Sequence, residues 1–134
     1  MEFMILIDTS AWIEFLRRRG DPVVKQAVAR LMEAELAAYT CPVAFELWSG
    51  VRAGEEADLE EAFSFSRHLP FVKMDWWEAA SLERRLRGAG KTIPRDDIFV
   101  ATVAIRAGVE LLCRDRHFDV IGEVVGRDLQ VRQV

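Results

Sequence analysis

Short apolar runs alternate along the chain with longer segments that carry apolar residues on one helical face. Residues 3–7 form a continuous apolar run, which is typical of a strand buried on both faces of a sheet. The next segment repeats apolar residues at helical spacing and ends near the three arginines at positions 17–19. Asp21 followed by Pro22 then predicts the start of a second helix, which runs to about residue 35. The chain therefore opens as a strand followed by two helices.

The same alternation continues to the end of the chain. Further strands are predicted from short apolar runs, or from alternating apolar and polar residues, at positions 36–40, 70–74, 110–113 and 129–134. Further helices are predicted from helical spacing and from cap, proline and glycine signals, at positions 43–51, 55–68, 75–88, 97–107 and 116–125. This alternation predicts a three-layer α/β/α sandwich with a central, mainly parallel sheet of four or five strands. Because no repeat or linker interrupts it, we expect one domain over residues 1–134.

Composition narrows the class of protein. Hydrophobic residues make up 51% of the chain and charged residues 30%, which is typical of a soluble globular domain. The net charge of −4 argues against a broad basic surface for nucleic acid, although bound divalent cations would reverse the sign at a local site. Cys41 and Cys113 lie far apart in apolar runs, so no zinc cluster is expected. No leader peptide or membrane-spanning run is visible, and we therefore expect a cytoplasmic protein.

Three acidic residues stand at positions that suit either a structural or a chemical role. Asp8 directly follows the first strand, and Asp115 follows the fourth strand by two residues. Each could simply cap the next helix, but both fall at carboxyl ends of strands, where open α/β sheets bind ligands. Glu46 is the only charged residue of an apolar helical segment, and no cation stands three or four residues away to pair with it. Glu46 therefore either reaches solvent through a narrow stripe or faces a cation.

Asp97 opens an almost wholly apolar helix, where one acidic residue would be enough to cap the helix and interact with its dipole. Asp96 and Asp97 are both present, so one carboxylate needs another explanation. If four such residues converge at one edge of the sheet, their carboxylates repel unless cations bind between them. Ligation by oxygen alone suits Mg²⁺ or Mn²⁺, and such ions activate a water for attack on a phosphate.

These residues resemble the PIN-domain family in order and spacing, and in particular its VapC-like ribonuclease toxins of toxin–antitoxin modules. The motifs are Ile-Leu-Ile-Asp8-Thr-Ser, then Glu46 in its apolar helix, Asp97-Ile-Phe-Val-Ala, and Leu-Leu-Cys-Arg-Asp115-Arg-His-Phe. The resemblance implies a Mg²⁺- or Mn²⁺-dependent endoribonuclease with a PIN-like fold and an RNA substrate. It also implies that Asp8, Glu46 and Asp97 bind the metal, and that Asp115 completes the site. A homodimer and a small cognate antitoxin protein are the partners that it implies.

Details of the resemblance bear on individual residues. Asp97 is chosen over Asp96 because the family pattern has an aspartate, two residues, an aliphatic residue and then alanine. The hydroxyl residue that follows the first aspartate in the family is supplied by Ser10 or Thr9. Cys113 departs from the threonine or serine that often stands two residues before the last aspartate. This departure puts a supporting hydrogen bond in doubt, but not the metal site.

Basic and aromatic residues supply candidates for contact with RNA or with a protein partner. Candidates for contact with the RNA backbone are Arg114, Arg116, Lys91 and Arg95. The arginines at 17–19 are interpreted as a solvated helix end, and His117 as a structural residue. The antitoxin is expected to insert an Arg or Lys into the acidic pocket and to occupy a neighbouring apolar groove. This groove would be lined by Trp12, Phe15, Leu16, Leu59, Phe63 and Phe65, of which at least half are expected to belong to the core.

Three other classes of protein remain as alternatives. A phosphoacceptor receiver domain also has an aspartate after a strand, but its acidic pair near the first strand and its lysine after the last strands are not clear here. A phosphatase with an aspartate nucleophile needs Asp-x-Asp, and Ser10 stands at the second position. A non-catalytic PIN-like module that binds RNA or protein would differ from the enzyme only in lacking metal-dependent cleavage.

Overall fold

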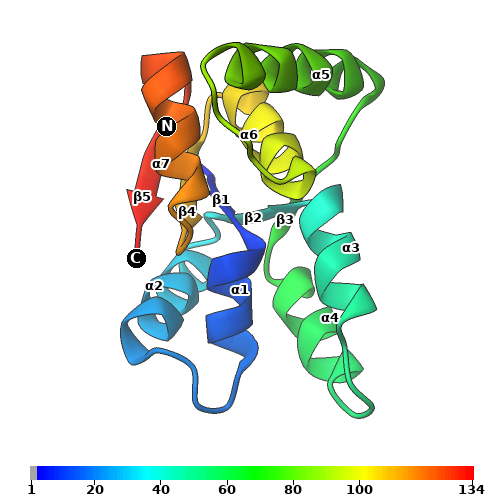
Figure 1. The fold of residues 1–134 in the computed structure, drawn as a ribbon. Helices are drawn as coiled ribbons and strands as arrows, with labels where there is room; N and C mark the ends of the chain where they lie inside the picture. Colours follow the sequence, from blue (N-terminus) through cyan, green and yellow to red (C-terminus); the bar gives the residue numbers. More distant parts are fainter. Residues whose placement is uncertain (1–2) are drawn as a thin grey trace.

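The computed structural model describes residues 3–134 and is built on a five-stranded sheet (Figure 1). The strands are β1 (Ile5–Ile7), β2 (Ala37–Thr40), β3 (Arg67–Leu69), β4 (Glu110–Cys113) and β5 (Val131–Gln133). Their order in the sheet is β3-β2-β1-β4-β5, and every neighbouring pair is parallel. The predicted α/β class and the parallel, five-stranded sheet are therefore confirmed.

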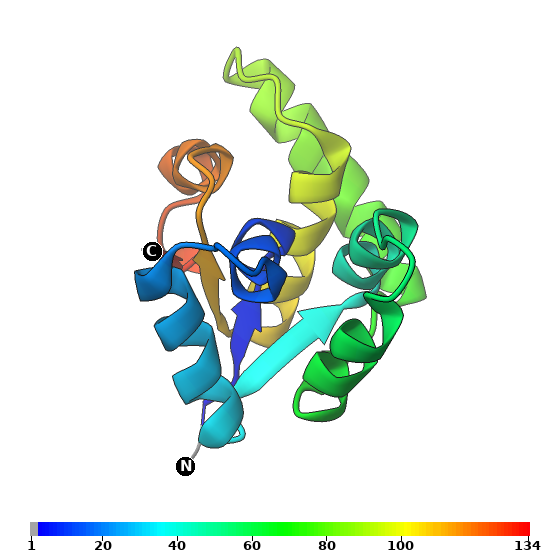
Figure 2. The same ribbon diagram turned by 90° about the horizontal axis from the view of Figure 1, so that it is seen from below.

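Seven α-helices cover the two faces of this sheet. They are α1 (Thr9–Leu16), α2 (Pro22–Glu33), α3 (Cys41–Ser49), α4 (Glu56–Ser64), α5 (Lys73–Gly88), α6 (Arg95–Ala107) and α7 (His117–Val125). Figure 1 shows α1, α2 and α4 on one side of the sheet and α5 and α6 on the other, and Figure 2 shows α5 and α6 side by side. Fully buried side chains of β1 and β4 pack at the centre against Trp12 and Phe118. Within residues 3–134, no helix is both long enough and apolar enough to span a membrane.

The chain reverses its direction across the sheet between β1 and β4. It passes from β1 outward to β2 and β3, and then returns to β4 on the opposite side of β1. The Asp8 N–H donates to the Leu112 carbonyl over 2.9 Å, so the carboxyl ends of β1 and β4 lie side by side. Open parallel sheets bind ligands at such a reversal, outside the carboxyl ends of the strands.

The third strand was predicted in the wrong place. Instead of a helix over 55–68 and a strand over 70–74, α4 ends at Ser64 and β3 covers Arg67–Leu69. As an edge strand, β3 pairs with β2 on one side only, and two of its three residues are exposed. It therefore lacks the apolar run that identifies buried strands, whereas Phe71 belongs to an aromatic cluster with Trp76 and Phe99.

The helix predicted over 75–88 begins two residues earlier, at Lys73, so Asp75 lies inside α5. The Asp75 carboxylate is fully buried and accepts hydrogen bonds from the Val72 N–H at 2.8 Å and from Arg106 Nε at 2.7 Å. Arg106 also donates to the Pro70 carbonyl over 2.8 Å. This ion pair joins α5 to the last turn of α6, the helix whose first turn carries Asp97.

This ion pair predicts a large loss of stability when its cation is removed. Arg106→Ala should lower the free energy of unfolding by about 3 kcal/mol, because the Asp75 carboxylate stays buried without its partner. Arg95→Ala removes an exposed pair with Glu83 and should leave the free energy of unfolding almost unchanged. Urea unfolding followed by circular dichroism gives both values, and equal losses would contradict the assignment.

Candidate metal centre

Asp8 lies at the carboxyl end of β1 with only 3% of its surface exposed. Its Oδ2 accepts hydrogen bonds from the Ser10 N–H at 3.0 Å and from the Ser10 hydroxyl at 2.6 Å. Ser10 Oγ in turn accepts a hydrogen bond from the Arg114 N–H at 2.9 Å. Asp8 therefore caps α1, as a purely structural role would require. The same contacts tie the loop after β4 to the loop after β1.

Asp97 and Asp115 meet at the imidazole of His117. Nδ1 of His117 lies 2.7 Å from Asp97 Oδ2 and 3.1 Å from Asp115 Oδ1. The backbone N–H of His117 also donates to Asp115 Oδ1 over 2.9 Å. Because α6 begins after Pro94 without a side-chain cap among the described residues, capping does not explain Asp97. His117, interpreted from the sequence as structural, thus contacts two of the predicted site residues.

Glu46 faces the other acidic residues. Burial raises its pKa to about 7, and the charges of Asp96, Asp8 and Asp97 contribute in the same direction. A carboxylate in a solvent-facing stripe would not respond to these charges in this way. Asp96 is exposed, but its charge affects Glu46 more strongly than that of Asp97 does. The sequence assigned Asp96 no role, because its effect depends on how α3 and α6 pack.

The four predicted residues therefore lie close enough together for the charge of one to shift the pKa of another. Burial raises the pKa of Asp97 to about 6, and the charges of Asp115 and Asp8 raise it too, whereas His117 lowers it. Burial likewise raises the pKa of Asp8, Ser10 lowers it, and the charge of Asp115 raises it. A cation between these carboxylates would relieve both the desolvation and the repulsion. Cys113 supplies a thiol where the family often has a hydroxyl. Burial raises the pKa of this thiol to about 12, and Sγ donates a long hydrogen bond to the Asp115 carbonyl over 3.8 Å.

Two of the four basic residues that are expected to contact RNA form ion pairs with carboxylates of the chain. Arg114 donates to Asp21 over 2.8 Å and lies 3.6 Å from Glu14, so its guanidinium group is held by carboxylates. Arg95 is similarly paired with Glu83 at 3.0 Å. By contrast, three arginines line a cavity of about 390 Å³ that also contains Glu46, namely Arg17, Arg18 and Arg52.

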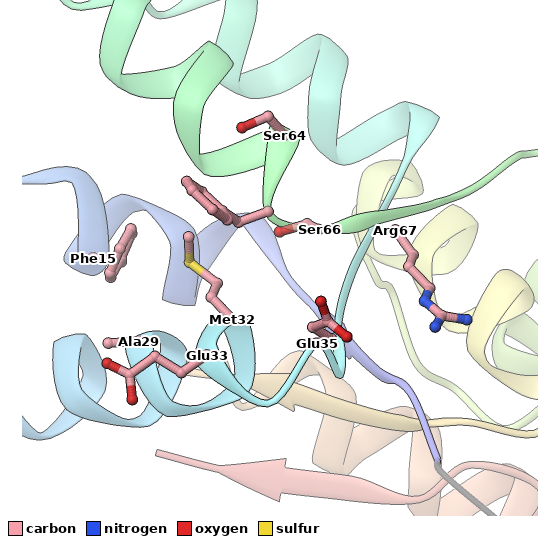
Figure 3. A pocket seen from close by; sticks show the side chains of 9 residues that line it. Phe15, Ala29, Met32, Glu33, Glu35, Ser64, Ser66 and Arg67 are labelled. Carbon is pink, nitrogen blue, oxygen red and sulfur yellow. The ribbon is translucent and has the colours of Figure 1, made fainter.

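The apolar groove predicted beside the site is partly core and partly surface. Three of its six residues are buried: Trp12, Leu59 and Phe63. Phe15 and Phe65 instead line an open groove of about 630 Å³ between α1, α2 and the end of α4 (Figure 3). Leu16 lines the 390 Å³ cavity that contains Glu46. Both hollows therefore lie along α1 and α4.

The raised pKa values predict how stability depends on pH when no cation is bound. In the folded chain the pKa of Glu46 is about 7 and that of Asp97 about 6, against ordinary pKa values of 4.5 and 3.8. The unfolded chain releases these protons at lower pH, so the free energy of unfolding falls as pH rises from about 4 to about 7. Glu46→Gln should reduce this fall by on the order of 1 kcal/mol, a value discounted for the partial exposure of the side chain.

Urea unfolding in EDTA at both ends of this pH range measures the effect. Glu60→Gln, at an exposed position of α4, is the matched control and should leave the pH dependence unchanged. If Glu46→Gln kept the full fall in stability, the Glu46 carboxylate would not be buried against the other acidic residues.

Known proteins resemble this chain in sequence and in fold. The family model of the PIN domain matches residues 5–124. Ribonuclease VapC11 of Mycobacterium tuberculosis is 36% identical over 129 residues, covering 90% of this chain and 93% of that protein. The crystal structure of VapBC2 from Rickettsia felis, bound to a DNA fragment from its promoter, matches this chain with a TM-score of 0.82 at 15% identity. The match covers 98% of this chain and 99% of that chain. A chain of a toxin–antitoxin complex from Klebsiella pneumoniae matches with a TM-score of 0.69 at 17% identity. This match covers 93% of this chain and 94% of that chain. The chain belongs to the PIN-domain family.

Proposed function

We propose that this chain is a metal-dependent endoribonuclease and the toxin of a toxin–antitoxin pair. The observation that carries the proposal is the convergence of Asp8, Glu46, Asp97 and Asp115, which come from four separate elements, at the carboxyl ends of β1 and β4. The similarity to a named VapC ribonuclease supports RNA as the substrate. We assign the activity to a single nuclease domain over residues 1–134, acting in the cytoplasm.

The chemistry of the donor set fits Mg²⁺ or Mn²⁺. Asp8, Glu46 and Asp97 would supply carboxylate oxygens, and Asp115 would act as a further ligand or as an acid behind them. Hard divalent cations prefer such oxygens, and these carboxylates are already destabilised by burial and repulsion. A bound ion would supply a water of lowered pKa for attack on the phosphodiester.

Other residues of the chain would position the site and the RNA. Ser10 orients the Asp8 carboxylate and, through the Arg114 N–H, holds the loop after β4 against it. Arg18 and Arg52 line the cavity beside Glu46, where guanidinium groups would bind phosphates of the RNA backbone. Such contacts fix the register of the RNA without reading its sequence.

Replacing Asp97 tests the catalytic role. Asp97→Asn keeps the shape of the side chain and removes its charge, so the fold should persist. Mg²⁺-dependent cleavage of a defined RNA should fall by more than about 100-fold, because losing even an outer partner of a metal ligand costs about 10- to 100-fold. Cleavage of an end-labelled RNA with and without Mg²⁺ or Mn²⁺ is the measurement, and sequencing of the products locates the cuts.

Two further aspartates serve as comparisons for Asp97→Asn. Asp128→Asn, at an exposed position, should leave cleavage unchanged, and the exposed Asp96→Asn should reduce it less than Asp97→Asn. Full activity in Asp97→Asn would move the site to Asp96 or refute it. An unmodified protein that binds RNA without metal-dependent cleavage would instead be the non-catalytic PIN-like module.

The two hollows along α1 and α4 are the proposed binding site of the antitoxin. Figure 3 shows Phe15 from α1, Met32 from α2 and Ser64 from α4 around the larger one. An amphipathic helix or extended segment would lay apolar side chains here. The smaller cavity then leads to Glu46, where an Arg or Lys of the antitoxin would pair with carboxylate and displace the metal.

Replacing Phe65 tests this binding site. Phe65 is 58% exposed, so Phe65→Glu should fold and cleave RNA as before. The variant should weaken the complex with the proposed antitoxin, the small protein encoded beside this chain and co-expressed with it. The expected loss is about 2 kcal/mol, or roughly 30-fold in Kd, because a charge replaces an anchoring contact. Val23→Glu, at a 67% exposed position outside both hollows, is the control. If a tight complex left cleavage and Mn²⁺ affinity unchanged, the displacement mechanism would be wrong.

A homodimer is proposed from exposed aromatic residues. The apolar faces of α6 are covered within this chain, mainly by α5, so that helix does not itself require a second copy. Trp76 and Trp77 on α5, however, are 54% and 62% exposed, and Phe45 on α3 is 75% exposed. Exposed aromatic residues of this kind are typical of interfaces. Light scattering at micromolar concentration should give twice the 15.3 kDa of one chain, and a monomeric mass would count against the dimer.

A further inference from the structure

His117 lies at the centre of the acidic site, although its position in the sequence assigned it no chemical role. Asp97, Asp115 and His117 each offer a ligand atom, and these atoms all lie within 4.8 Å of one another. We infer that His117 is a nitrogen ligand of the metal centre and makes the site prefer Mn²⁺ over Mg²⁺. This inference rests on the proposed metal-dependent function and adds a residue to its ligand set.

The spacing of the donor atoms fits ligation of a single ion. Two ligands at neighbouring corners of an octahedral ion, with bonds of about 2.1 Å, lie about 3 Å apart. His117 Nδ1 lies 2.7 Å from Asp97 Oδ2 and 3.1 Å from Asp115 Oδ1. In the ion-free chain the same spacing lets the imidazole hydrogen-bond to these carboxylates, so His117 keeps together the oxygens that a cation would bind.

The backbone around His117 fixes the position of the ring. His117 is the first residue of α7, and its N–H donates to Asp115 Oδ1 over 2.9 Å. The next residue, Phe118, is fully buried and anchors the start of the helix in the core. The His117 side chain itself is 45% exposed, so the imidazole ring is open to solvent on part of its surface.

A nitrogen donor changes which ion the site prefers. Mg²⁺ binds almost entirely through oxygens and gives up its waters reluctantly, whereas an imidazole suits transition metals. Carboxylate, carbonyl and water ligands, by contrast, suit Mg²⁺ and Mn²⁺ alike. Carboxylates alone would therefore discriminate little between Mg²⁺ and Mn²⁺, and His117 supplies the discrimination.

The experiment uses the full chain loaded with Mn²⁺ and needs no RNA. Electron spin-echo spectroscopy detects a ¹⁴N nucleus bonded directly to Mn²⁺, and calorimetry measures Kd for Mn²⁺ and for Mg²⁺. His117→Gln should abolish the ¹⁴N signal and raise the Kd for Mn²⁺ by about tenfold or more, with less than about a threefold change for Mg²⁺. His68 is the only other histidine in the sequence; it lies on the exposed strand β3 and contacts Cys41 of α3. His68→Gln is therefore the control, and it should change neither the ¹⁴N signal nor the two Kd values.

The outcomes separate this inference from the proposed function. Mn²⁺ bound at one site without a ¹⁴N signal would overturn the role of His117 and leave the metal-dependent function standing. If the chain bound neither Mn²⁺ nor Mg²⁺, the proposed function itself would fail. If His117→Gln does not fold, the unmodified chain labelled with ¹⁵N-histidine tests the ligation instead. Ligation requires the echo pattern of the labelled chain to differ from that of the unlabelled chain.

Discussion

The burial of carboxylates at the carboxyl ends of β1 and β4, together with the repulsion between them, is the constraint on which the site depends. Burial raises the pKa of Asp8 and of Asp97, and the charge of Asp115 acts on both in the same direction. Without a cation such a cluster opposes folding, because its charged form is disfavoured. The surrounding residues therefore hold the cluster in place, with Ser10 bonded to Asp8 and His117 bonded to Asp97. The elements that do this must be stable for other reasons, and the buried strands with their covering helices provide that stability.

The strand order converts distant positions into neighbours. Because the chain returns to β4 beside β1, the residues after these strands meet although about a hundred positions separate them. Glu46 and Asp97 arrive from helices on different crossovers, and α3 packs against α6. The site is thus assembled from four segments, none of which is a site alone. This explains why each acidic residue, taken separately, has a plausible structural role, and why only their joint position indicates metal chemistry.

The sequence predicted those parts of the molecule that local chemistry determines. β1 and β4 are buried apolar runs, so Asp8 and Asp115 could be placed at their carboxyl ends, and Glu46 was identified by its lack of a local cation. β3 was misplaced because its position is set by pairing with β2 and not by its own apolar pattern. His117 was missed because its partner Asp97 lies 20 positions away, and the contact exists only once α6 and α7 have packed.

On the proposed function, two kinds of cation compete for the same negative charge. A divalent ion and an antitoxin side chain would each relieve the repulsion that the fold maintains, so binding of either lowers the affinity for the other. Glu46 connects the two events, because it interacts with Asp8 and Asp97 on one side and lines the cavity between α1 and α4 on the other. A segment that filled this cavity would meet the metal site at Glu46 first. Inhibition would then follow both from neutralising one carboxylate of the set and from covering Arg18 and Arg52, which would otherwise contact the RNA backbone.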